Sequence, residues 1–286
     1  MVASVFGSLV GGVGTLISGN QLRLLILEES KRANVGHIGS ALSVADIIAV
    51  LFGDILNFSP EDAFSRDRFI LSKGHAALAL YAALYCKGFL DRKELATYCQ
   101  DGTLLGTHPE PIPGTIDFGT GSLGHGLSFG VGAAIASRMD RSTRRVYVLV
   151  SDAELNEGSH WEAVMFAAHH KLDVLTAVVD YNGQQAMGKT RDILSLDPLR
   201  DRWSAFGWQA IETDGHDPAA LKEAFQNAAS TSEKPSVIIA KTTAGKGVSF
   251  MENLVQWHYL PMTDEQYVQA CSEIRELSCE PRLPKL

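Results

Sequence analysis

Two oxygen-bearing side chains, Asp152 and Asn182, occupy positions where a hard cation can be held. Each follows an apolar, β-branched run of strand length, residues 146–150 in the first case and 174–179 in the second. In an open parallel sheet, ligands bind beyond the carboxyl ends of the strands. Carboxylate and amide oxygens delivered there suit Mg²⁺. An Asp N-cap and an Asn turn, both common after strands, are the alternative explanation of the same pair.

Histidines beside glycines form the second group of chemically capable residues. Any one of them taken singly is best explained as a surface or helix-capping residue. Several such loops, all at element ends, indicate a shared site, because imidazoles donate to phosphates and sugar hydroxyls and titrate near neutral pH. These histidines are His37, His75, His108 and His125.

The other histidines carry weaker signals. His169 and His170 fall inside a predicted helix and are expected to be structural. His160 and His216 have no context that raises them above surface residues.

The elements that must position these residues follow from hydrophobic periodicity. Between the two apolar runs, residues 158–171 carry apolar side chains at helical spacing, so the segment 146–179 predicts a strand–helix–strand unit. Further strands are expected at residues 68–71, 208–212 and 237–241, with helices between them. The pattern predicts an α/β fold with a doubly wound, mostly parallel sheet and helices on both faces.

Two glycine-rich segments resemble nucleotide-binding motifs and are rejected as such. Gly119, Gly121 and Gly124 have the spacing of a dinucleotide fingerprint, but no convincing strand precedes them and no suitable acidic residue follows. Residues 242–247 resemble a P-loop, but they lack its first glycine and the Ser or Thr after the lysine. The glycines still permit close approach of the backbone to a flat or anionic ligand.

A set of motifs, in order along residues 20–265, carries a family resemblance. The motifs are GHIGS, SKGHA, GTHPE, GTGSLGHGLS, SDAELNEG with DYN, and KTTAGKGVSFMEN with WH. The set resembles the N-terminal, pyrophosphate-binding domain of a transketolase. The resemblance implies the thiamine-diphosphate-binding fold, with thiamine diphosphate anchored through Mg²⁺ or Ca²⁺.

The resemblance also implies roles for residues around the diphosphate. Asp152 and Asn182 become the metal ligands, together with the backbone carbonyl of Gln184. His75 and the backbone around Ala153 would contact the diphosphate.

Other matched positions belong to the ring and substrate side of the cofactor. Gly121 and Leu123 would face the aminopyrimidine through their main chain. Glu157 resembles a position that reaches across a subunit interface towards the cofactor-activating glutamate. The substrate channel would be lined by His37, His108 and His258.

Two departures from the family pattern lie close to the expected cofactor. The family's Gly-Asp-Gly is Ser151-Asp152-Ala153 here, which adds a methyl group where the backbone approaches phosphate. The family's Gly-Gln-Gly is Gly124-His125-Gly126, which places an ionisable group near the cofactor. His125 is therefore also expected among the cofactor-binding residues.

The length of the chain points to a divided enzyme. A complete transketolase continues into a pyrimidine-binding domain and a further C-terminal domain, whereas this chain has 286 residues. It resembles the alpha subunit of a split transketolase that transfers a two-carbon ketol unit from a ketose phosphate to an aldose. A beta subunit would complete the site in an α2β2 assembly.

Two other functions remain open at this point. One is another thiamine-diphosphate half-enzyme, either an E1-alpha-like subunit or a specialised two-carbon transferase. The other is a non-catalytic assembly subunit with a decayed site.

Composition sets the outer bounds. A net charge of −8 argues against a nucleic-acid-binding surface. Four scattered cysteines without CxxC spacing are typical of a reduced, cytoplasmic protein. The expected organisation is an apolar, glycine-rich extension at 1–19, the pyrophosphate-binding domain at 20–265 and a tail at 266–286. The extension is short and diluted by glycine, so a membrane span is not expected.

Overall fold

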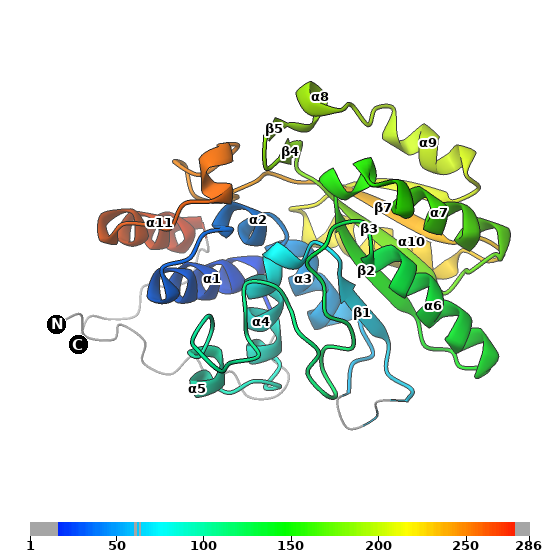
Figure 1. Ribbon diagram of the computed structural model, residues 1–286, viewed down its shortest axis with the longest axis horizontal. Coiled ribbons are helices and arrows are strands. Elements are labelled where there is room, and N and C mark those ends of the chain that lie inside the picture. Colours follow the sequence, from blue (N-terminus) through cyan, green and yellow to red (C-terminus); the bar gives the residue numbers. More distant parts are fainter. Residues whose placement is uncertain (1–16, 60–61, 63, 278–286) are drawn as a thin grey trace.

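A parallel five-stranded sheet forms the centre of the molecule in the computed structural model, which describes residues 17–59, 62 and 64–277 (Figure 1). The strand order is β1-β2-β3-β7-β6, and every neighbouring pair is parallel. The strands are β1 (Arg68–Leu71), β2 (Val146–Ser151), β3 (Leu175–Tyr181), β6 (Gln209–Asp214) and β7 (Ser236–Lys241).

The central strands form because their side chains are buried on both faces. All six residues of β2 are buried, and so are the first six of β3. Such continuous apolar runs are typical of parallel sheets covered by helices on both sides. In the register of these strands, Ser151 pairs with Asp180 and Tyr181 pairs with Lys241. Their carboxyl ends therefore meet at one edge of the sheet.

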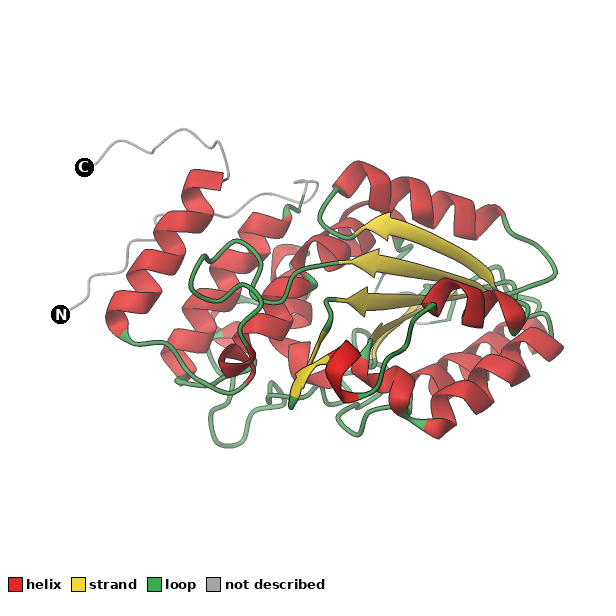
Figure 2. Cartoon of the chain, turned by 90° about the horizontal axis from the view of Figure 1, so that it is seen from above, coloured by secondary structure: helices red, strands yellow, loops and turns green. Residues whose placement is uncertain are grey.

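Helices cover both faces of the sheet, as Figure 2 shows. One core includes residues of the first group of helices with Tyr147, Leu149 and Ile238 of the sheet. This group comprises α1 (Gly19–Ala33), α2 (Ile38–Ser43), α3 (Ala45–Val50), α4 (Ala77–Cys86), α10 (Pro218–Ser230) and α11 (Asp264–Leu277).

The second core lies on the opposite face and joins Val148 and Val179 of the sheet to another group of helices. This group comprises α6 (Gly126–Met139), α7 (Gly158–His169) and α9 (Leu199–Ala205). The predicted doubly wound fold is confirmed, because alternate residues of each strand enter opposite cores.

Short elements connect this framework. They are the π-helix η1 (Leu51–Ile55), the 3₁₀ helices η2 (Gly74–Ala76), η3 (Ala153–Asn156) and η4 (Val255–His258), the helices α5 (Arg92–Leu95) and α8 (Thr190–Ile193), and the hairpin strands β4 (Gln184–Gln185) and β5 (Gly188–Lys189). The hairpin and α8 follow β3 directly and lead to α9.

The spacing of Ser43 and Asp46 in the sequence resembles that of a helix capping box, but the structure does not bear this out. The Ser43 hydroxyl instead donates to Asp180 at 2.7 Å, and the Asp46 carboxylate pairs with Arg23 and His216. These partners lie far away in the sequence, so short-range spacing does not reveal them. His216 is correspondingly not the surface residue that the sequence predicts: its imidazole bridges Asp46 and the N–H of Thr243.

The segment expected as a C-terminal tail begins with a helix. The boundary predicted at residue 265 falls inside α11, which packs against α1 and buries Ala270, Cys271 and Ile274 (Figure 1). Residues 1–16 of the expected extension and 278–286 of the expected tail lie outside the described residues. Within the described part of the chain, no helix is long and apolar enough to span a membrane.

Candidate functional site

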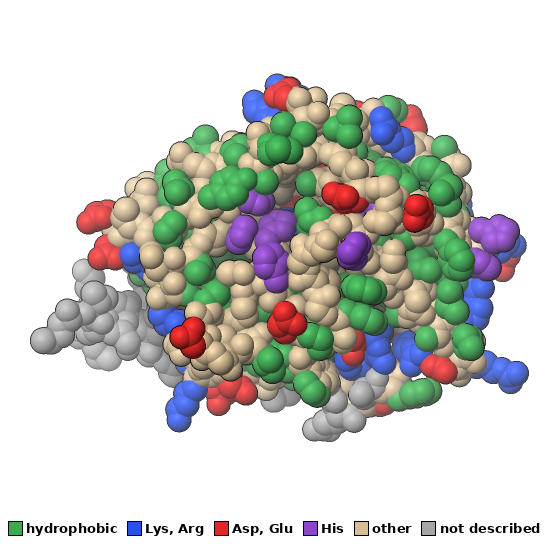
Figure 3. Space-filling view, in the orientation of Figure 1, with side chains coloured by type: hydrophobic (Ala, Val, Ile, Leu, Met, Phe, Trp, Pro, Cys, Tyr) green, Lys and Arg blue, Asp and Glu red, His purple; other side chains and the backbone are tan. Residues whose placement is uncertain are grey.

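A cavity of about 510 Å³ lies beyond the carboxyl ends of β1, β2 and β3. In Figure 3 the histidines gather in a hollow near the middle of the face shown. Most of the side chains expected at the site line this cavity, although they come from segments far apart in the sequence. They are His37, His75, His108, His258, Gly121, Leu123, Ala153, Glu157, Asn182 and Gln184.

The histidines form a compact cluster. The ring of His37 lies 5.6 Å from that of His75, 6.2 Å from that of His108 and 5.2 Å from that of His258, measured between centroids. His75 and His258 are 5.1 Å apart. The cluster brings together two loops with η2 and η4. The shared site inferred from the Gly-His pattern is therefore present for three of its four histidines, His37, His75 and His108, and His258 joins them from η4.

Backbone contact holds two of these rings together. The N–H of His37 donates to the carbonyl of His258 at 3.2 Å. A Cβ atom on Gly36 would lie 2.2 Å from the carbonyl oxygen of Tyr259, so only glycine allows the loops to approach this closely. His37 itself has a left-handed φ of 61° at the start of α2.

Burial favours the neutral form of three rings, those of His37, His75 and His258. Desolvation, with the nearby Lys73 charge second, holds the pKa of His75 well below its usual value. Desolvation, followed by the His37 ring, lowers the pKa of His258 to about 4. The pKa of His37 is lowered by desolvation and then by His108, and its buried Nδ1 atom has no partner within the described part of the chain. Neutral rings each offer one N–H donor and one acceptor to a ligand.

Asp152 lies beneath the cavity and is fully buried. Its Oδ2 atom accepts hydrogen bonds from the N–H of Gly183 and the hydroxyl of Thr190, each at 2.9 Å. Its Oδ1 atom is buried and has no partner among the described residues. Desolvation and then the Asp180 charge raise the pKa of Asp152 to about 7. A bound cation would give the Oδ1 atom of Asp152 the partner that it lacks. The residues present therefore fit a metal site.

Asn182 is anchored on the side away from the cavity. Its amide Nδ2 donates to Asp180 at 3.0 Å, while its Oδ1 accepts from the N–H of Gln184 at 2.9 Å. Asp180 is fully buried and forms an ion pair with Lys73. In the described residues, no three His, Cys, Asp or Glu side chains converge on a metal position. The expected ligand set instead combines one carboxylate, one amide and one main-chain carbonyl.

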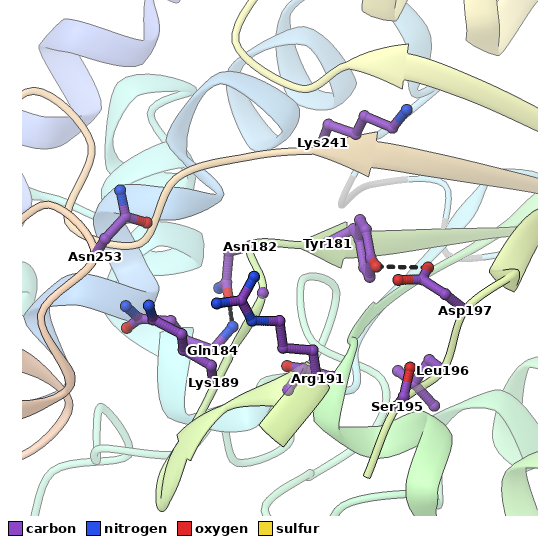
Figure 4. A pocket seen from close by; sticks show the side chains of 12 residues that line it. Tyr181, Asn182, Gln184, Lys189, Arg191, Ser195, Leu196, Asp197, Lys241 and Asn253 are labelled. Carbon is purple, nitrogen blue, oxygen red and sulfur yellow. Dashed lines mark hydrogen bonds between the residues drawn. The ribbon is translucent and has the colours of Figure 1, made fainter. Parts of the chain in front are cut away.

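A second cavity, of about 570 Å³, lies on the other side of Asn182 and Gln184, which line both cavities. Figure 4 shows its basic side chains, among them Lys189 and Lys241. It also shows the hydroxyl of Tyr181, which donates to Asp197 at 2.8 Å. The segment that carries two of the three expected cation ligands, Asn182 and Gln184, therefore separates the two cavities.

The glycine-rich loop before α6 is fastened by a residue that the sequence does not single out. Glu154 is fully buried and accepts from the N–H groups of Gly124 and Ser151, each at 2.9 Å. Gly124 has a φ of 85°, and a Cβ atom there would lie 2.5 Å from that of Glu157. The loop thus packs tightly against the start of α7 and carries Gly121 and Leu123 to the cavity.

His125 is placed differently from the expectation. It is exposed at the start of α6 and does not line the cavity. Its placement gives no support to a role at the cofactor. Ala153 begins η3 and lines the cavity, so the departure from glycine does add its methyl group at the expected place.

Several residues of the site are not found by sequence reasoning. Lys73 lies within the SKGH motif, and its position beside His75 is the signal that was available. Ser40 likewise belongs to the GHIGS motif. The hairpin and α8 carry no such signal, and they contribute Gln185, Ala186, Met187, Ile193 and Leu194 to the cavity wall.

The parallel sheet and the cavity at its carboxyl edge define an α/β protein that binds a ligand at the ends of its strands. The family model described as "Transketolase, thiamine diphosphate binding domain" matches residues 16–277. One subunit of the apulose-4-phosphate transketolase of Phocaeicola vulgatus is 42% identical over 257 residues, covering 89% of this chain and 91% of that protein. The SqwG subunit of the 6-deoxy-6-sulfo-D-fructose transketolase of a Clostridium species is 40% identical over 260 residues, covering 90% and 94%.

Solved structures agree with these relatives. Transketolase from Campylobacter jejuni superposes with a TM-score of 0.85 at 30% identity, covering 90% of this chain and 42% of that one. The chain therefore belongs to the transketolase family, as the motifs predict. Its extent matches that of single subunits of split transketolases, which confirms the predicted alpha-type subunit, and it spans about two fifths of the solved transketolase.

Proposed function

We propose that this chain holds the diphosphate of thiamine diphosphate through a divalent cation, Mg²⁺ or Ca²⁺. Asp152, Asn182 and the main-chain carbonyl of Gln184 would bind the cation. The observation that carries this proposal is the buried Oδ1 atom of Asp152, which lacks a partner among the described residues. A buried carboxylate oxygen without a partner is costly, and a cation supplies the missing interaction.

Other residues of the cavity would hold the rest of the cofactor. His75 and the backbone at Ala153 face the space expected for the diphosphate. Gly121 and Leu123 would contact the aminopyrimidine through their main chain. Glu157, exposed at the mouth of the cavity, would reach towards the partner subunit.

The proposed reaction is transfer of a two-carbon ketol unit. Bound thiamine diphosphate supplies a nucleophilic carbon and an electron sink, so that C2–C3 of a ketose can break and C2 can join the aldehyde carbon of an aldose. His37, His108 and His258 would contact the sugar hydroxyls. A neutral ring nitrogen can take the proton of the donor C3 hydroxyl and return a proton to the acceptor's oxygen.

A partner subunit would complete the active site. Relatives of matching length are named as subunits of transketolases for apulose 4-phosphate and for 6-deoxy-6-sulfo-D-fructose. We infer that this chain likewise acts with a beta subunit that carries the pyrimidine-binding domain. Sugar phosphates as substrates, an α2β2 assembly and a cytoplasmic location complete the proposal.

Calorimetric titration tests the proposal. Thiamine diphosphate with Mg²⁺ is titrated into the chain alone and into its mixture with the candidate partner. We expect tight binding only in the mixture, together with ketose-to-aldose transfer. Replacing a residue that only orients a metal ligand typically weakens metal binding by roughly 10–100-fold. Asp152→Asn changes a proposed ligand itself, so we expect it to weaken binding by more than this. Asp201→Asn is the matched control, because Asp201 is an exposed residue of α9 and its replacement should leave binding unchanged.

The other outcomes are equally informative. Tight binding by Asp152→Asn would remove this residue from the site. No binding in an assembled wild-type complex would favour the non-catalytic subunit with a decayed site. Binding accompanied by oxidative decarboxylation of 2-oxo acids instead of ketol transfer would favour an E1-alpha-like function.

A further inference from the structure

One oxygen atom of Asp152 closes the base of the β4–β5 hairpin. Its Oδ2 receives a main-chain N–H from Gly183, just before the hairpin, and a hydroxyl from Thr190, just after it. The N–H of Thr190 also donates to the carbonyl of Gly183 at 2.9 Å. Both ends of the segment 184–189 are therefore fixed to a carboxylate that comes from the end of β2.

This arrangement determines which way the carboxylate faces. With both donors on Oδ2, only Oδ1 is left for a ligand, and Oδ1 has no partner among the described residues. The two donors oppose rotation of the carboxylate about its Cβ–Cγ bond. Thr190 is 4% exposed, so water cannot readily replace its hydroxyl.

The Thr190 hydroxyl also helps to hold the segment that contains Gln184, another expected ligand. Gln184 follows Gly183 directly and pairs with Lys189, the residue before Thr190, across the hairpin. Loss of the Thr190 hydroxyl would leave the main-chain bonds of the hairpin but remove its side-chain link to Asp152, so the segment whose main-chain carbonyl is expected at the cation would be held less firmly. Two ligands would then lose part of their preorganisation.

We propose that Thr190 is a positioning residue for the cation: its hydroxyl fixes the Asp152 carboxylate and the hairpin that carries Gln184. The inference rests on the proposed function, because it assumes that Asp152 and Gln184 hold the cation. Thr190 touches neither cofactor nor substrate in this role. Its effect is expected chiefly in cation affinity.

Three variants separate positioning from a general structural role. Thr190→Val removes the hydroxyl with little change of shape, and Thr190→Ser keeps the donor. Thr176→Val is the matched control, because Thr176 is also a fully buried threonine whose hydroxyl has no partner among the described residues. Mn²⁺ binding is measured by electron paramagnetic resonance on the full chain assembled with its partner subunit, in the presence of thiamine diphosphate.

We expect Thr190→Val to weaken Mn²⁺ binding by roughly 10–100-fold, the usual effect of losing a partner that orients a metal ligand. Thr190→Ser and Thr176→Val should bind Mn²⁺ like the wild type. In the metal-free state, Thr190→Val should remain folded at the assay temperature but melt below Thr176→Val, because only Thr190→Val loses a buried hydrogen bond. Saturating Mn²⁺ should restore thiamine diphosphate affinity to Thr190→Val.

Contrary results have distinct meanings. Equal Mn²⁺ affinity in the wild type and Thr190→Val would overturn the positioning role and leave the proposed function intact. A loss in Thr190→Ser as large as in Thr190→Val would also overturn it, because the hydroxyl would not be the cause. Absence of Mn²⁺ binding in the wild-type assembly would overturn the proposed function and this inference together.

Discussion

Charges buried under the cavity define the site at the scale of single residues. Lys73 and Asp180 form an ion pair with side chains 1% and 0% exposed. Asp180 also accepts from Ser43 and Asn182. The pair therefore links the SKGH motif to the amide of an expected cation ligand. Such a pair contributes less by its own attraction than it costs when one partner is removed.

Replacement of Lys73 should show how much stability is lost when the buried Asp180 carboxylate has no ion-pair partner. Lys73→Met leaves the Asp180 carboxylate buried and uncompensated, so we expect a loss of about 3–5 kcal/mol in the free energy of unfolding, measured in urea. Lys171→Met is the control, because its pair with Glu233 is largely exposed and should leave stability nearly unchanged. Equal stability of both variants would show that Asp180 is compensated by its other donors.

The buried ring of His258 gives a spectroscopic prediction. Because burial lowers the pKa of His258 to about 4, its ring should stay neutral from the weakly acidic range upward. Nuclear magnetic resonance titration of the histidine ring protons should show one resonance, lost in His258→Gln, with a midpoint near this value. In denaturing urea the same ring should titrate near the ordinary histidine value of about 6.5. An unshifted midpoint in the folded protein would contradict the lowered pKa of His258.

At the scale of elements, helix α7 holds a residue that the sequence places wrongly. His160 is predicted on the surface, yet it is fully buried between the rings of Trp161 and Trp203. Both of its ring nitrogens lack a partner among the described residues, and burial lowers its pKa to about 3. The apolar side of α7 thus encloses a polar ring that stays neutral.

His160 should make the protein sensitive to acid. Below about pH 6.5 the unfolded chain binds a proton at this ring, while the folded chain does not until about pH 3. The free energy of unfolding should therefore decrease as the pH is lowered through this window, by up to about 1.4 kcal/mol per pH unit. The free energy of unfolding is measured in urea between pH 7 and pH 4.5. It should depend less steeply on pH for His160→Leu than for the wild type. Identical slopes would mean that another group dominates.

At the scale of the whole molecule, the first core extends beyond the sheet. Helix α11 packs on α1, and its Ile274 is fully buried. A Cβ atom on Gly247 would lie 2.5 Å from the Ile274 side chain, so the segment after β7 also packs closely there. The C-terminal helix is therefore joined to the layer that supports His37 and α2.

Truncation of this contact should destabilise the whole molecule. Ile274→Ala leaves a cavity in a closely packed core, so we expect a loss of about 2–5 kcal/mol in the free energy of unfolding. Val268→Ala on the same helix is the control, because Val268 is 66% exposed and should change stability by less than about 0.5 kcal/mol. Denaturation in urea measures both. A small effect of Ile274→Ala would show that α11 contributes little to the core.

The sequence by itself determined the strands and the edge at which the site lies. β-branched runs specify β2 and β3 locally, and Asp152 and Asn182 follow the ends of these strands whatever the remaining packing. The motifs carried the family because each is a continuous segment of the chain, readable without its tertiary contacts. These features depend on neighbours in the chain.

Only the tertiary structure decided which side chains share partners. Ser43 and Asp180 are 137 residues apart, and Asp152 and Thr190 are 38 apart, so no periodicity connects them. The burial of His160 depends on Trp203, which comes from another helix. Such contacts form because packing two faces of the sheet brings distant polar groups into a space without water. There each must find a partner or keep its neutral form.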